Sequence, residues 1–297
     1  MPRLHPRSAR RLVLIAGLAA IASVLAAFEW PVGPVQPAAL FGSAGGGSFV
    51  TGIELASAGG LVKAADSGEM AFAWDNGTQA ASRLPSTIGS YVIVEHPRGM
   101  AGVYAELEPG SASSYLTKVS KDSILGKAGA SGMTGDTGLF FGIYDRGARR
   151  WVNPFLLLPP WADKATPQIR GALLLRDGKS WSLGDVKSVP QGQYLVAVDV
   201  SEPLDAAHSA GPSVPYFVRL VVNGVKAAER SFDVVSCDAG RQYVGSDSPW
   251  SFEDSFLPDG KMLMGSRLLS RGKAVIQVLV RDYSGNERQA SWTVIVE

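Results

Sequence analysis

The chain has 297 residues, a formal charge of +1 and no cluster of lysine and arginine that would form a basic stripe. This charge balance gives no electrostatic support for nucleic-acid binding. A hydrophobic content of 46% with 34 glycines and 18 prolines is typical of strands joined by turns, and the single cysteine excludes a disulfide within the chain.

The amino terminus has the pattern of an export signal. Four arginines precede an uncharged run over residues 12–28, as in the basic and apolar regions of a signal peptide. A run of about 17 apolar residues also approaches the length that spans a membrane. Residues 1–28 are therefore predicted to be a signal peptide or membrane anchor. We expect the remainder in the periplasm or cell envelope, with anchoring through residues 12–28 if the segment is kept.

A glycine-rich stretch over residues 42–48 follows. It lacks the lysine and the helix of a phosphate-binding loop. Residues 29–48 are accordingly predicted to be a flexible lead-in.

Three short motifs stand out between residues 49 and 160, joined by β-prone runs with no helical period. They are Val50-Thr51-Gly52-Ile53-Glu54, Tyr104-Ala105-Glu106-Leu107 and Thr137-Gly138-Leu139-Phe140-Phe141-Gly142-Ile143. Their order and spacing resemble the H-x-G-x-D, Y-A-H-L and T-G-x-H-L-H-F motifs of the lysostaphin/LytM-type zinc peptidases of peptidoglycan. The resemblance implies a compact antiparallel β domain over residues 49–160. It also implies that the family's metal-ligand positions fall at Val50, Glu54, Glu106, Phe140 and Gly142.

The residues at these positions change the expected chemistry. A hydrolytic zinc needs about three protein ligands and one open position, and valine, phenylalanine and glycine side chains cannot bind zinc. Glu54 and Glu106 keep carboxylates, which suit hard cations such as Ca²⁺ or Mg²⁺ better than zinc. The sequence therefore predicts no zinc cofactor, although the family uses one, and predicts that the domain is not an active enzyme.

Other catalytic arrangements have weak support. His96 falls where relatives often carry a histidine that is not a ligand, and a strand-end residue bonded to backbone is the better interpretation. His5 and His208 lie outside the motifs, and Cys237 follows a strand-like run, as a structural cysteine would. Glu54 and Glu106 as the acid and base of a glycosidase remain a minor alternative.

A proline pair at Pro159-Pro160 ends the first pattern, and a second domain is predicted over residues 165–297. Roughly seven β-prone runs over about 130 residues suggest an immunoglobulin-like or fibronectin-like sandwich. Asn223-Gly224, between two valines, is a strong hairpin signal. The aromatic stretch from Trp250 to Phe256 is either a binding loop or a connection packed onto the sandwich.

The predicted fold class is thus all-β, in two domains. The leading functional hypothesis is an inactive, peptidase-like envelope protein that binds peptidoglycan or regulates a cell-wall hydrolase. Its groove would be lined by the former ligand positions, with Trp74 and Tyr104 as binding residues. The alternatives are an active zinc endopeptidase with displaced ligands and a purely structural envelope protein.

Overall fold

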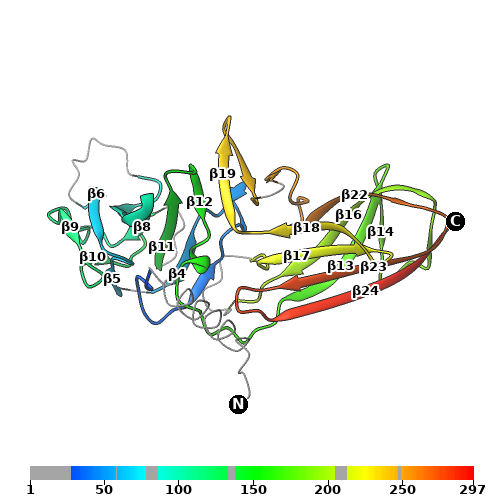
Figure 1. The fold of residues 1–297 in the computed structure, drawn as a ribbon, viewed down its shortest axis with the longest axis horizontal. Helices are drawn as coiled ribbons and strands as arrows, with labels where there is room; N and C mark the ends of the chain where they lie inside the picture. Colours follow the sequence, from blue (N-terminus) through cyan, green and yellow to red (C-terminus); the bar gives the residue numbers. More distant parts are fainter. Residues whose placement is uncertain (1–27, 58, 78–85, 133–137, 205–212, 247–248) are drawn as a thin grey trace, which may run out of the picture.

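The computed structural model describes residues 28–57, 59–77, 86–132, 138–204, 213–246 and 249–297. The regular elements in these residues are β-strands apart from two short 3₁₀ helices, η1 (Pro97–Gly99) and η2 (Pro154–Leu156), which confirms the all-β prediction. Figure 1 shows two β units along the long axis, with the carboxyl terminus at the far end of the second. Within the described part of the chain no helix has the length and apolarity to cross a membrane. The predicted signal or anchor lies outside the described residues except for Phe28.

An antiparallel sheet of eleven strands forms the first unit. Nine strands follow the order β21-β20-β19-β12-β11-β8-β7-β6-β9, and β4 pairs with β1 and with β11. The strands are β1 (Pro37–Ala39), β4 (Ile53–Ala56), β6 (Gly68–Trp74), β7 (Ser90–Glu95), β8 (Met100–Leu107), β9 (Lys118–Val119), β11 (Gly138–Asp145), β12 (Arg150–Val152), β19 (Val234–Asp238), β20 (Arg241–Val244) and β21 (Trp250–Ser251).

Alternation along these strands separates a core face from an outer face. Ile53, Tyr104 and Phe141 are fully buried on the core face, where they share one hydrophobic cluster. Two small ribbons complete the unit, namely β2 (Ala44–Gly45) with β3 (Ser48–Phe49) and β5 (Leu61–Lys63) with β10 (Ile124–Lys127).

Residues 29–48 differ from the predicted flexible lead-in. The structure places β1 and β2 in this segment, and Leu40 and Phe41 are fully buried. The apolar run directly before the glycines packs into the core, whereas residues 44–48 of the β2–β3 ribbon are exposed. The prediction was wrong because it rested on the glycines and not on the apolar residues that precede them.

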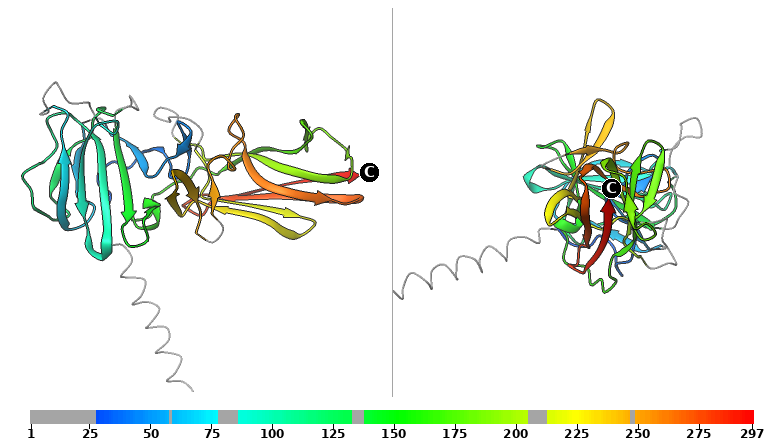
Figure 2. Two further views of the ribbon diagram at one scale, coloured as in Figure 1. Left: turned by 90° about the horizontal axis from the view of Figure 1, so that it is seen from above. Right: turned by 90° about the vertical axis from the view of Figure 1, so that its right-hand side faces the viewer.

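The second unit is a sandwich of a four-stranded and a five-stranded sheet (Figures 1 and 2). The four-stranded sheet contains β14 (Lys179–Ser182), β13 (Gln168–Arg176), β16 (Gly192–Ser201) and β22 (Met262–Leu269). The five-stranded sheet contains β15 (Ser188–Val189), β24 (Glu287–Val296), β23 (Gly272–Arg281), β17 (Phe217–Val222) and β18 (Val225–Ser231). Asn223 and Gly224, at φ 51° and 78°, form the predicted turn between β17 and β18.

One hairpin within residues 165–297 belongs to the first sheet. Strand β19 pairs with β12, with Ser236 opposite Arg150 and Val235 opposite Trp151, and β20 and β21 extend the sheet further. The sequence predicted that residues 165–297 form one sandwich domain. The structure instead places β19, β20 and β21 of this range in the first sheet. Figure 1 shows this hairpin standing beside β12 at the junction of the two units.

The aromatic stretch after the hairpin packs against the first unit. The ring of Phe49, at the end of β3, contacts those of Trp250, Phe252 and Phe256 edge-on or nearly so, with centroids 6.1, 5.1 and 6.2 Å away. Trp250 also contacts Phe232. The stretch is therefore a packed connection, but one that packs against Phe49 of the first unit, which the sequence did not predict.

Candidate functional site

Strand β11 brings three of the five family positions onto the outer face of the first sheet. Phe140 lies directly opposite Glu54 on β4 and opposite Ala105 on β8. Gly142 is two residues further along β11 and so shares the face of Phe140. Glu54 and Phe140 are half-buried. The two partner strands thus fix the relative positions of Glu54, Phe140 and Gly142.

The Phe140 ring lies against two glycines. A Cβ atom at Gly52 would lie 2.7 Å from Cζ of Phe140, and one at Gly142 would lie 3.1 Å from its Cε1 and 2.9 Å from Cζ3 of Trp151. Real Cβ atoms essentially never stand closer than 3.0 Å to another heavy atom, and a contact of 3.1 Å is tighter than most. The space above both glycines is therefore taken by aromatic carbon.

The two remaining positions lie on the edges of this region. Val50 directly follows β3 and is half-buried, and its N–H donates to the carbonyl of Ser43 at 2.9 Å. Glu106 is 6% exposed and has φ 66°. Its Oε1 lies 3.0 Å from where a Cβ would stand at Gly132, so the carboxylate points toward the loop after β10.

These residues do not fit the zinc ion of the family. A zinc site takes imidazole, thiolate or carboxylate donors. Phe140, Gly142 and Val50 offer none, and the space beside Phe140 is filled by its ring. Two carboxylates, Glu54 and Glu106, are the donors that remain at the five positions.

Tyr104 and Trp74, the predicted binding residues, have different surroundings. Tyr104 is fully buried and belongs to the core. Its hydroxyl accepts the N–H of Ala65 at 2.8 Å and contacts Nε2 of His96 at 3.2 Å. The reason is the alternation of β8, which turns Tyr104 away from the outer face. Trp74 is half-buried on β6, where its Nε1–H donates to Oδ1 of Asn76 at 2.8 Å.

His96 has the structural role that the sequence indicated. Its Nδ1 lies 3.0 Å from the carbonyl oxygen of Ser67, and burial lowers the pKa of its imidazole. The neutral ring therefore donates from Nδ1 and accepts the Tyr104 hydroxyl proton at Nε2. This pair ties the end of β7 to the turn before β6.

A groove on the outer face adjoins Gly142 and was not foreseen from the sequence. This outer groove has a volume of about 410 Å³ and is lined by Ala71, Ile93, Ala101, Val103, Tyr144 and Trp151, with Glu95 and Arg146. Glu95 and Arg146 form an ion pair with each other. The sequence pattern that could have predicted this groove is a series of apolar side chains at strand positions that alternate with the core positions.

Comparison with known proteins finds a family model that matches part of the first unit. Residues 48–154 match the model of peptidase family M23. Residues 166–297 match a second family model. No curated protein matches the chain.

Several solved structures resemble the chain at low identity. A mutant catalytic domain of the prophage-encoded M23 protein EnpA from Enterococcus faecalis has 20% identity and a TM-score of 0.34, covering 41% of this chain and 90% of that one. The SpoIIQ–SpoIIIAH pore-forming complex has 22% identity and a TM-score of 0.36, covering 45% and 92%. Lysostaphin from Staphylococcus simulans has 14% identity and a TM-score of 0.33, covering 88% and 95%.

Proposed function

Because residues 48–154 match the model of peptidase family M23, we propose that this domain binds peptidoglycan at the cell envelope without hydrolysing it. The observation that carries the proposal is the Phe140 ring between Gly52 and Gly142. An aromatic ring cannot polarise a peptide carbonyl or activate water, which are the tasks of a hydrolytic metal. The ancestral cleft would thereby have become part of a binding surface.

The outer groove supplies the surface for the ligand. Its walls combine small side chains, Ala71 and Ala101, with the rings of Tyr144 and Trp151. Aromatic and small apolar walls with a few polar groups are typical of sites that hold small ligands. The Arg146 guanidinium at the rim is half-exposed and already ion-paired with Glu95. It can therefore exchange this partner for a carboxylate of a cell-wall peptide.

Metal content and hydrolysis test the first half of the proposal. The full-length protein is analysed for zinc by plasma mass spectrometry and incubated with purified sacculi in added zinc. We expect substoichiometric zinc and no released muropeptides. Zinc near one equivalent together with released muropeptides would establish an active endopeptidase with displaced ligands and overturn the proposal.

A blocked groove tests the second half. Ala71 is exposed on β6, so Ala71→Arg places a long charged side chain over the groove without entering the core. Thr293→Arg adds the same side chain at an exposed strand position of the sandwich. In sacculus co-sedimentation we expect Ala71→Arg to lower the bound fraction severalfold and Thr293→Arg to leave it unchanged.

The co-sedimentation result separates three cases. Equal binding by both variants and the unmodified protein would show that the ligand binds outside the groove. No binding by any of them would refute the proposal and leave a structural role or a role through another protein, such as a cell-wall hydrolase.

A further inference from the structure

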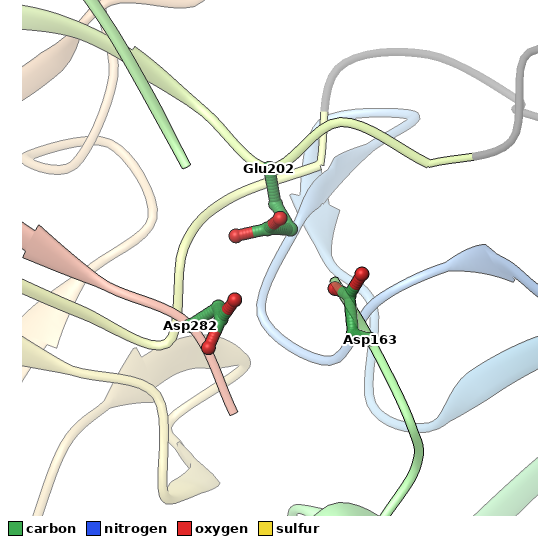
Figure 3. A group of neighbouring side chains, drawn as sticks. All are labelled: Asp163, Glu202 and Asp282. Carbon is green, nitrogen blue, oxygen red and sulfur yellow. The ribbon is translucent and has the colours of Figure 1, made fainter. Parts of the chain in front are cut away.

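Three carboxylates converge at the junction between the two units. Asp163 comes from the connection between η2 and β13, Glu202 follows β16, and Asp282 follows β23. One oxygen of each lies within 4.8 Å of the others. Figure 3 shows the three side chains pointing toward a common space from three separate segments.

Among the residues that the structure describes, Glu202 has no hydrogen-bond partner. Its residue is 3% exposed, and both Oε1 and Oε2 are buried without a donor. Burial, together with the charges of Asp282 and Asp163, raises the pKa of Glu202 to about 9. A buried and unpaired carboxylate is costly, so such groups in proteins are normally paired, protonated or bound to a metal.

The neighbouring groups orient the other two carboxylates rather than neutralise them. Asn286 donates its backbone N–H to Oδ1 of Asp282 at 2.8 Å and its side-chain amide to Oδ2 at 2.7 Å. The same amide donates to the carbonyl of Ala165 at 3.0 Å, and the N–H of Ala165 donates to Oδ1 of Asp163 at 2.8 Å. Among the described residues no lysine or arginine forms an ion pair with these three carboxylates.

We propose that Asp163, Glu202 and Asp282 bind a calcium ion that fastens the connection between the units to the sandwich. The donor set contains only oxygen, and three carboxylates from separate segments match the ligands of a hard cation. Zinc is disfavoured because neither histidine nor cysteine belongs to the cluster. Magnesium is disfavoured because it keeps several of its waters and is seldom held by an all-protein cage. The ion would satisfy both Glu202 oxygens, and Asn286 would hold the ligands in place as outer-shell partners do.

Calcium binding by the full-length protein tests the proposal directly. After dialysis against a chelator, CaCl₂ is titrated by calorimetry at about pH 7.5 up to about 10 mM, since extracellular sites bind at about 10⁻⁴ to 10⁻³ M. We expect one site, a Tm that rises with CaCl₂, and at least about tenfold weaker binding of MgCl₂.

Two substitutions locate the ion. Glu202→Gln should weaken calcium binding by at least about tenfold, as loss of a ligand does, and should abolish the rise in Tm. Its metal-free form should be at least as stable as the unmodified protein at about pH 8, because no buried carboxylate must hold a proton. Glu253→Gln, at an exposed position, is the matched control and should bind calcium normally.

Two outcomes would overturn the proposal. Absence of binding and of any Tm shift up to about 10 mM calcium would mean that Glu202 is simply buried in its protonated form. Normal calcium binding by folded Glu202→Gln would place the ion elsewhere.

Discussion

The contact between Phe140 and Gly142 is a residue-scale feature that a double-mutant cycle can measure. Gly142→Ala places a methyl group 2.9 Å from the Trp151 ring and 3.1 Å from the Phe140 ring, and overpacking of this kind costs about 1–3 kcal/mol. In a Phe140→Ala background one of the two rings is gone, so the same substitution should cost less. Urea unfolding of the four proteins gives the coupling, and additivity within about 0.5 kcal/mol would contradict this packing.

The buried imidazole of His96 should make the free energy of unfolding depend on pH. Burial lowers the pKa of the folded-state imidazole below its ordinary value of 6.5, although the Ser67 carbonyl and Asp66 oppose the shift. The unfolded chain therefore binds more protons in the window just below pH 6.5. Stability from neutral His96 is present above pH 6.5 and is lost as the pH falls from there through the lower folded-state pKa.

The comparison with His96→Gln isolates this contribution from other titrating groups. The unfolding free energies of the two proteins, measured in urea from about pH 8 to about pH 5, should differ most at high pH and converge as the pH falls. Profiles that stay parallel throughout would show that His96 titrates alike in the folded and unfolded chains.

At the scale of elements, the β19–β20 hairpin has a predictable role in the first sheet. Ser236 lies between Arg150 on β12 and Tyr243 on β20. Ser236→Pro removes a ladder donor from an inner strand and should cost about 3 kcal/mol or more. Ser236→Ala keeps the backbone donor and is the control. Thermal unfolding followed by near-ultraviolet circular dichroism is the measurement, and equal Tm values for the two variants would show that β19 is not an integral strand.

This hairpin also marks the limit of what the sequence predicts. The turn at Asn223-Gly224 depends on local backbone preferences, so its two residues suffice to place it. The pairing of β19 with β12 joins residues that are over 80 positions apart, and no local pattern encodes such a contact. The same reasoning applies to the site. The motifs single out Phe140, Gly142 and Glu54, which the pairing of β11 with β4 holds close together. The burial of Tyr104 and the outer groove depend instead on which face each strand turns outward.

The whole molecule should unfold as one cooperative unit, although the sequence suggests two domains. Besides the shared sheet, the buried Asn153 side-chain amide donates to the Phe232 carbonyl at 2.7 Å and to the Tyr283 hydroxyl. The Tyr283 ring stacks on that of Phe155, with centroids 4.6 Å apart. Contacts of this kind are lost together when either unit opens.

Differential scanning calorimetry measures this cooperativity. We expect a single transition in the unmodified chain with equal calorimetric and van't Hoff enthalpies. Asn153→Ala leaves the Phe232 carbonyl and the Tyr283 hydroxyl without this donor at the junction, a cost of about 1–3 kcal/mol, and should broaden or split the transition. Asn76→Ala removes a side-chain partner of Trp74 far from the junction and should leave the transition single. Two separated transitions in the unmodified chain would mean that the shared strands and aromatic contacts do not couple the units.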